Sequence, residues 1–352
     1  MRLLNITASS LFSAGLQQGQ LAQPQIQTWL SGSEMSNLID FALNDPVGNK
    51  AFRSIRQNTT TAYPELVTEL EGMAEGADIP LDYIWVANMI AELNPLLPAT
   101  ASSHCTDVYA HDPATKSSFH GHNEDWSVAA KPLWFYVSLT PATPAANFAH
   151  CAGFAYPGSM IAYAPAWNAH GIYQTQNTLF PNNTRDDGGL ACSFVQRAAL
   201  CSDATTSIDA YLSRLHTENW ASGASLNVVD ANTGEMANAE VLLDDFDVFR
   251  VKQNYTHTNE FKHLQQGIFV DDGEDSATHR QARLDEMDAP ASLADIAEML
   301  GDTKDGAFPV YRDITLSTNL LDVSSGILTV WDGTNAMSQA PTWQWNIITW
   351  FQ

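Results

Sequence analysis

The chain has 352 residues, of which 45% are hydrophobic, and this is enough apolar material for a large core in one or two domains. Asp and Glu number 40 against 16 Lys and Arg, giving a formal net charge of −24. This charge excludes nucleic acids and anionic membrane surfaces as expected partners, because both would repel the chain. The sequence has no run of about 18 apolar residues, so we expect no transmembrane helix.

The N-terminal part of the chain is predicted to be helical. Residues 1–16 lack the continuous apolar segment and cleavage motif of a signal peptide, so we expect a structured element there. Apolar residues recur at helical spacing in Pro64–Ala77 and in residues 81–93. Pro95 follows and ends the helical region, and residues 99–104 form a small, polar connector.

The character of the sequence changes at Cys105. Short segments rich in aromatic and β-branched residues, separated by Pro, Gly and Asn, predict strands from this point onward. The predicted strands are 106–110, 117–122, 133–139, 147–155, 160–164, 171–177, 224–230, 235–242, 248–253, 314–322 and 326–331. The predicted helices among them are 190–201, 207–215, 280–286 and 292–300.

The order of these elements predicts the fold class. Strands and helices come in groups without strict alternation, which argues against a doubly wound parallel sheet. We therefore predict an α+β fold in which two antiparallel sheets pack face to face with helices outside, a four-layer αββα sandwich. We expect residues 1–104 to form a mainly helical pro-segment and residues 105–352 to carry the sheets, together making one domain.

Four cysteines, Cys105, Cys151, Cys192 and Cys201, are spread along the chain without a C-x-x-C pair. This spacing indicates neither a zinc site nor a disulfide framework. We therefore expect reduced thiols and a cytoplasmic protein.

Cys105 is placed where a new N-terminus would serve catalysis. It is the first residue of the strand-rich part and follows the connector that ends in His104. If the bond between His104 and Cys105 is cut, Cys105 offers both a thiol and an α-amine with a pKa of about 7.7–8.0, which can act as a base near neutral pH. A buried, inert cysteine is the alternative interpretation.

A second polar segment lies at the end of the next predicted strand, where His122 is followed by Asn123, Glu124 and Asp125. A strand, a turn and a returning strand would bring Asp125 back beside the start of the first strand. Its carboxylate could then orient the ammonium group of Cys105. A turn or capping role is the alternative for Asp125.

Several short motifs occur together in the order and spacing of a known family. They are Cys105-Thr106-Asp107, Gly121-His122-Asn123-Glu124-Asp125, 135–138, 168–172, Asn177, Ser225-Leu226-Asn227, 257–259 and 315–318, with 64–77 and 88–92 upstream. The chain resembles the N-terminal-nucleophile hydrolases of the penicillin acyl-transferase branch, which includes isopenicillin N acyltransferase. More narrowly it resembles the hydrolases of N-β-alanyl amines. The resemblance covers roughly residues 62–333.

The resemblance implies catalytic roles. Cys105 would be the nucleophile, Asp125 would orient its amine, and the side-chain amide of Asn227 would stabilise the tetrahedral oxyanion. Asn177 would be a further polar contact near the substrate. The alternative interpretations are a polar residue at a strand edge for Asn227 and a turn residue for Asn177. Ser317 would line the site.

One position departs from the family pattern, because His104 stands where the family usually has glycine before the nucleophile. Glycine permits the strained backbone that favours an N-to-S acyl shift. His104 could therefore slow self-cleavage, or its imidazole could assist proton transfer.

A metal site is the competing interpretation of the histidines. His120 and His122 would share one face of a strand, the spacing that chelates zinc, and His104 and His111 lie nearby in sequence. No third ligand is marked by spacing. We therefore predict no metal and no other cofactor, with His120 a packing residue and His122 a residue beside the substrate.

The predicted function is a self-processing cysteine amidohydrolase that cleaves a small N-acyl amine, with β-alanyl amines as one candidate. The alternatives are transfer of the acyl group to an amine acceptor, as in an acyl-CoA:6-aminopenicillanate acyltransferase, and a scaffold without activity. The 16 Lys and Arg residues are scattered and mark no basic patch for coenzyme A phosphates, which favours hydrolysis. The expected partners are the amide substrate and the two cleaved chains for each other, and the sequence leaves oligomerisation open.

Overall fold

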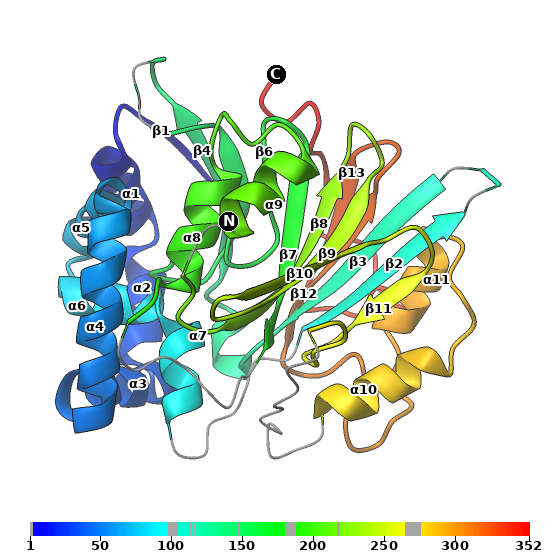
Figure 1. Ribbon diagram of the computed structural model, residues 1–352, viewed down its shortest axis with the longest axis horizontal. Helices are drawn as coiled ribbons and strands as arrows, with labels where there is room; N and C mark the ends of the chain where they lie inside the picture. Colours follow the sequence, from blue (N-terminus) through cyan, green and yellow to red (C-terminus); the bar gives the residue numbers. More distant parts are fainter. Residues whose placement is uncertain are drawn as a thin grey trace.

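A computed structural model gives the arrangement of the chain (Figure 1). It describes residues 3–97, 105–112, 114–115, 117–144, 146, 148–179, 188–216, 219–264 and 276–352. The predicted cleavage residue His104 and the connector before Cys105 lie outside the described residues.

Helices make up most of the N-terminal part, as predicted. They are α1 (Leu11–Leu21), α2 (Gln23–Ser31), α3 (Ser33–Asn44), α4 (Pro46–Ala62), α5 (Pro64–Ala77), α6 (Leu81–Ala87), α7 (Ile90–Leu93) and the short 3₁₀ helix η1 (Asn94–Leu96). The chain enters them from a strand, β1 (Leu3–Ala8). Helix α5 has the predicted bounds, and its first residue is the proline that a first helical turn tolerates.

The larger sheet has eight strands in the order β1-β4-β5-β6-β7-β8-β9-β10. Its strands after β1 are β4 (Phe135–Pro141), β5 (Cys151–Ala155), β6 (Ala166–Asn168), β7 (Ile172–Leu179), β8 (Gly223–Asp230), β9 (Met236–Leu242) and β10 (Asp245–Arg250). Six of the seven neighbouring pairs are antiparallel, and β1 pairs parallel with β4. The prediction of antiparallel sheets is thus corrected at this one edge.

The smaller sheet has six strands in the order β11-β2-β3-β12-β13-β14, and it carries Cys105 at one end. Its strands are β11 (Tyr255–His257), β2 (Thr106–Asp112), β3 (Ser117–Asp125), β12 (Thr315–Asp322), β13 (Ile327–Asp332) and β14 (Trp343–Asn346). Its pairs are all antiparallel. The remaining helices are η2 (Val128–Ala130), α8 (Cys192–Leu200), α9 (Ile208–His216), α10 (Ser276–Asp285) and α11 (Leu293–Leu300).

The four predicted layers are present (Figure 1). Helices α1 to α9 lie on the side of the eight-stranded sheet, and α10 and α11 cover the six-stranded sheet from the opposite side. One large apolar core fills the space between and behind the sheets, and a smaller one joins α11 to the six-stranded sheet through residues such as Val108, Ile296 and Leu320. The αββα prediction is confirmed.

The predicted helix at residues 81–93 and the predicted strand at residues 160–164 were wrong, and the side chain of Asn88 contributes to both differences. Residues 81–93 form two helices because the chain breaks at Asn88, whose Nδ2 donates to the carbonyl oxygen of Gly158 at 2.9 Å. Residues 160–164 form turns and no strand, since Asn88 Oδ1 accepts from the backbone N–H of Met160 at 2.9 Å. Ala162 has φ of 82°, which a strand does not allow.

The prediction of reduced cysteines is also wrong for one pair. Cys151, the first residue of β5, is disulfide-bonded to Cys201, which follows α8, and their Cα atoms are 5.3 Å apart. Cys105 and Cys192 are free and buried. The fold brings together residues that are 50 positions apart, which linear spacing does not reveal. Disulfides are typical of oxidising compartments, so a cytoplasmic location stays a prediction.

Candidate active site

Cys105 directly precedes β2, and it is buried, with 3% of the residue exposed. Side chains alternate along a strand, so Cys105 shares the inner face of the sheet with Asp107. Its Sγ lies 3.8 Å from Oε1 of Glu124 on the neighbouring strand β3. Burial, together with the negative charge of Glu124, raises the pKa of the thiol to about 12, so the thiol is protonated in the intact chain.

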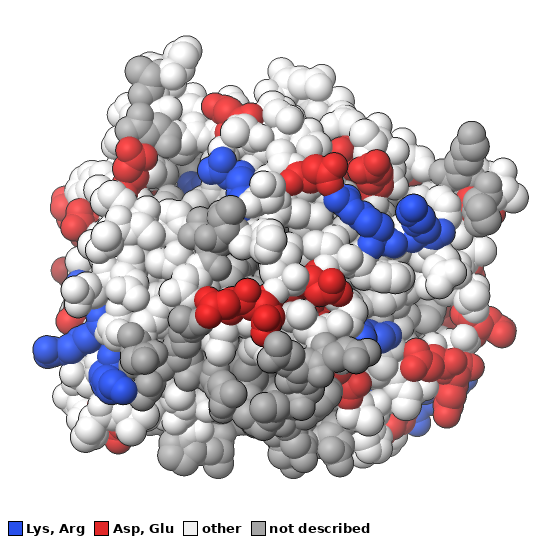
Figure 2. Space-filling model, in the orientation of Figure 1, with Lys and Arg blue, Asp and Glu red and all other residues white. Residues whose placement is uncertain are grey.

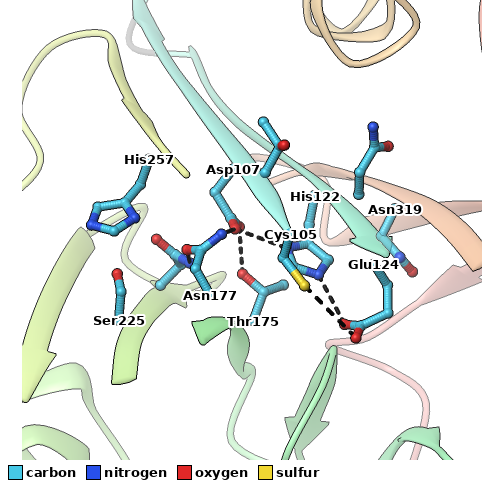
Figure 3. Close-up of polar contacts among 12 residues, drawn as sticks. Cys105, Asp107, His122, Glu124, Thr175, Asn177, Ser225, His257 and Asn319 are labelled. Atoms are coloured by element: carbon cyan, nitrogen blue, oxygen red, sulfur yellow. Dashed lines mark hydrogen bonds and ion pairs between the residues drawn. The ribbon is translucent and has the colours of Figure 1, made fainter. Parts of the chain in front are cut away.

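His122 links two carboxylates in the interior (Figure 3). Its Nδ1 is 2.8 Å from Oδ2 of Asp107, and its Nε2 is 3.0 Å from Oε2 of Glu124. Burial by itself lowers the pKa of a histidine, but the adjacent Asp107 outweighs it and raises the pKa of His122 well above its ordinary value. The imidazole is therefore a buried cation held between two anions.

Asp107 connects the two sheets. Thr175 and Asn177 of β7, in the opposite sheet, donate to its two carboxylate oxygens, Asn177 through Nδ2 at 2.8 Å. Burial opposes the charge, but the two neighbouring histidines, His122 and His120, bring the pKa of Asp107 well below its usual range. Asp107 thus remains an anion in the middle of the sandwich.

The predicted residues Asn177 and Asn227 continue this network. Asn227 on β8 donates through Nδ2 to Oδ1 of Asn177 at 2.8 Å and accepts from the hydroxyl of Tyr109 at 3.0 Å. Both asparagines are fully buried in central strands rather than at a turn or strand edge. Hydrogen bonds therefore run without interruption from Glu124 through His122, Asp107 and Asn177 to Asn227.

Asp125 lies close to the start of β2, as predicted, but on the other face of the sheet. It follows Glu124 on β3, and strand alternation directs its side chain toward the helices that cover this sheet. Arg312 pairs with its Oδ2 at 2.9 Å. Its Oδ1 is buried and has no hydrogen-bond partner among the described residues.

Ser317 lies on β12 directly opposite Glu124 in the strand register, and it is buried. Its Oγ accepts a hydrogen bond from Nδ2 of Asn319 at 3.0 Å. The predicted residues Cys105, His122, Asn177, Asn227 and Ser317 therefore share the inner region between the sheets.

Sequence reasoning missed three residues that touch this arrangement. Glu124 contacts the thiol, and Asp107 connects the sheets. Arg280 of α10 donates through Nη1 to the carbonyl oxygen of Cys105 at 2.8 Å. The strand register places Glu124 at the thiol, because pairing Asp107 with His122 sets residue 105 opposite residue 124, and the sequence alone does not give this register. Nothing in the local sequence marks Arg280, which lies 175 positions from Cys105.

Cys105, His122 and Glu124 offer ligand atoms within 4.8 Å of one another, a spacing that could hold a metal ion. Both ring nitrogens of His122 already face carboxylates, and a protonated imidazole has no lone pair for a metal. The ion pairs of His122 with Asp107 and Glu124 explain why these side chains lie close together. The absence of a metal remains a prediction.

Comparison with known proteins identifies the family. Residues 113–329, more than half of the chain, match the family described as acyl-coenzyme A:6-aminopenicillanic acid acyl-transferase. The chain belongs to this family. The matched region starts after Cys105 and includes Asp125, Asn177, Asn227 and Ser317. The predicted family is confirmed.

Individual proteins are also similar to this chain. It is 22% identical over 359 residues to the β-alanyl-dopamine/carcinine hydrolase of Drosophila melanogaster, covering 92% of this chain and 91% of that protein. Two solved structures of conjugated bile acid hydrolase from Clostridium perfringens, each of a variant with one substitution, are 12% identical. They cover 69% and 68% of this chain and 97% and 96% of those chains, with TM-scores of 0.37 and 0.36.

In the described part of the chain, the helices are too short or too polar for any of them to cross a membrane.

Proposed function

We propose that this protein is a self-processing amide hydrolase in which Cys105 becomes the N-terminal nucleophile. Its substrate is a small N-acyl amine, and the Drosophila relative makes a β-alanyl amine the first candidate. The observation that carries the proposal is the position of Cys105, a buried thiol that directly precedes the interior strand β2 and contacts a buried carboxylate. The family assignment supports the same activity class.

Turnover would use the α-amine that the cut releases. That amine takes the thiol proton as Sγ attacks the amide carbonyl, and it returns the proton to the leaving amine. Oδ1 of Asp125 supports this step, because it is a buried acceptor near the start of β2 with no hydrogen-bond partner among the described residues. An ammonium group at Cys105 would satisfy it.

The oxyanion would be stabilised from the opposite sheet. Asn227 and Asn177 present amide groups on adjacent central strands, and their hydrogen bond uses one of the two N–H groups of Asn227. His122 and Ser317 would line the substrate pocket beside Cys105. Water would then hydrolyse the acyl-cysteine.

Hydrolysis is favoured over transfer to an amine acceptor. Transfer from acyl-coenzyme A would require a basic surface for its phosphates. On the face in Figure 2, Lys and Arg lie in small separate groups among acidic residues. This distribution, with only 16 Lys and Arg in the chain, supports water as the acceptor.

The decisive experiment compares the wild type with Cys105→Ala on a β-alanyl amide. Intact-mass measurement of the purified wild type should give two chains divided before Cys105, and the variant should stay uncut and inactive. Cys105→Ser should turn over poorly, because a hydroxyl is a weaker nucleophile. An active Cys105→Ala protein, or a wild type that is fully active as one chain, would contradict the proposal.

Asn227→Ala tests the oxyanion role. Because the oxyanion exists only along the reaction path, kcat should fall by about 10²–10³ with little change in KM. Asn44→Ala, at an exposed position of α3, is the matched control and should keep wild-type kcat. Unchanged turnover in Asn227→Ala would place the oxyanion donor elsewhere.

A further inference from the structure

The first cut of the chain poses a chemical problem that turnover does not share. Before the cut, the nitrogen of Cys105 belongs to a peptide bond and cannot act as a base. Burial and nearby carboxylates keep the thiol protonated, with its pKa raised to about 12. Self-cleavage, which is part of the proposed function, therefore needs another group to take the thiol proton.

Glu124 is the group that the structure places at the thiol. Its Oε1 is 3.8 Å from Sγ of Cys105, within hydrogen-bond range for sulfur, and the pair is buried (Figure 3). Strand pairing fixes this contact, because the neighbouring pair Asp107–His122 sets residues 105 and 124 opposite each other on the inner face.

Two side chains fix the position of the Glu124 carboxylate. The Tyr156 hydroxyl donates to Oε1, and Nε2 of His122 lies 3.0 Å from Oε2. His122 also lies near the thiol. Both of its ring nitrogens face carboxylates, so the protonated ring has no lone pair that could accept the thiol proton. Glu124 has oxygen lone pairs available for the thiol proton.

We propose that Glu124 is the general base of self-cleavage. Sγ forms a bond to the carbonyl carbon of residue 104 while its proton moves to Oε1 of Glu124. The bond from that carbon to the nitrogen of Cys105 then breaks, and the proton passes from Glu124 to this nitrogen, which becomes the α-amine. Water hydrolyses the thioester, leaving a carboxylate at residue 104 and restoring the thiol.

Self-cleavage and substrate turnover would then use different general bases. Glu124 acts once, on the intact chain, and the α-amine released by the cut acts in each later turnover. The proposal rests on self-cleavage before Cys105, yet it can fail while the proposed hydrolase activity stands.

The experiment follows cleavage of newly made full-length protein by pulse-labelled cell-free synthesis and intact-mass analysis. Glu124→Gln keeps the shape but removes the base, and it should slow the cut by about 10² or more. Glu240→Gln is the matched control, since Glu240 is also buried and paired with a histidine, His257, at 3.0 Å. It should cut at the wild-type rate. Hydroxylamine, which cleaves thioesters, should release no fragment from Glu124→Gln, because the thiol has not attacked.

The outcomes distinguish the two proposals. A Glu124→Gln chain that cuts within threefold of the wild type, or that accumulates a hydroxylamine-sensitive thioester, overturns the role of Glu124 alone. A wild type that never cuts overturns self-cleavage and this role together.

If Glu124→Gln proves unfolded by circular dichroism, Glu124→Asp and Glu124→Ala provide the test. The aspartate retains a carboxylate at a longer distance and should cut at least about ten times faster than the alanine variant. Equal rates in these two variants overturn the proposal.

Discussion

At the scale of single residues, the site depends on charged side chains that are buried away from the surface. Asp107, His122 and Glu124 are all buried, and each is in contact with an opposite charge. Removing one partner of such a group usually destabilises a protein by about 3–5 kcal/mol, because the remaining charge is buried alone. These contacts hold Cys105 and Glu124 in place. Substituting Asp107, His122 or Glu124 should therefore lower the stability of the fold.

The raised pKa of His122 predicts how stability varies with pH. A histidine with a raised pKa in the folded state contributes fully below its unfolded pKa of about 6.5, and the contribution declines as the pH rises toward the folded value. The wild type should lose up to about 1.4 kcal/mol of unfolding free energy per pH unit above 6.5 from this group. Burial lowers the pKa of His120, so this ring is protonated only in the unfolded state, and it adds a smaller slope of opposite sign that fades within about one pH unit above 6.5.

Urea titrations of the wild type and His122→Gln between pH 6.5 and 8.5 measure this effect. The stability difference between the two proteins should shrink as the pH rises. A difference that is constant over this range would show that His122 is not charged in the folded protein.

The sequence identified some of these residues and missed others for a physical reason. Cys105, Asp125 and Asn227 could be singled out because they belong to short local motifs, and their catalytic roles stay predictions. The contact of Glu124 with Cys105 depends on strand register, and the Cys151–Cys201 disulfide depends on how distant elements pack. Neither is contained in the spacing of residues along the chain.

At the scale of elements, helices α1 and α5 pack unusually closely. Each carries two glycines four residues apart, which places both on one face of the helix. A Cβ on Gly15 would lie 1.9 Å from the carbonyl oxygen of Glu69, and one on Gly76 would lie 2.3 Å from that of Leu16. The two backbones touch, so there is no room for a side chain between them.

Substituting these glycines should separate the helices. Gly15→Ala should lower the unfolding free energy by about 1–3 kcal/mol, because backbone atoms cannot move aside as a flexible side chain does. Gly306→Ala, which meets nothing within 4 Å, is the control and should change stability little. Thermal denaturation followed by circular dichroism provides the comparison. Equal melting temperatures for the two variants would contradict the close contact.

Elements with a strong periodic pattern were predicted well, and those shaped by distant contacts were not. Helix α5 has the predicted bounds because its apolar face and its proline are both local signals. The break at Asn88 comes from bonds to the segment around Gly158 and Met160, 70 and 72 positions away. Strand β14 is four residues long and was missed, since it forms only by pairing with β13.

At the scale of the whole molecule, the parts before and after Cys105 form one body. Arg197 of α8 pairs with Glu69 of α5 at 3.1 Å, and both are buried. Glu92 Oε1 accepts from the backbone N–H of Cys192 at 2.8 Å. Gln18 donates through Nε2 to the carbonyl oxygen of Ser159 at 2.9 Å. These contacts cross from the predicted pro-segment to the part that carries the sheets.

The two products of self-cleavage should therefore stay together. We expect residues 1–104 and 105–352 to elute as one species in size-exclusion chromatography with light scattering, and to separate only in denaturant. Both should unfold in a single transition, because they share one core. Separate elution in native buffer would mean that the predicted pro-segment leaves after the cut.

Strand β1 covers an edge of the eight-stranded sheet that would otherwise be open. It pairs along Tyr136–Pro141 and forms the outer edge of the eight-stranded sheet beside β4. Without it, β4 would present unpaired N–H and C=O groups together with buried apolar residues such as Tyr136 and Val137. An open edge of this kind is a template for pairing with another chain and for aggregation. If the chain is cut before Cys105, β1 should stay paired with β4 and keep this edge covered. A chain expressed from Cys105 alone should aggregate, which light scattering would detect.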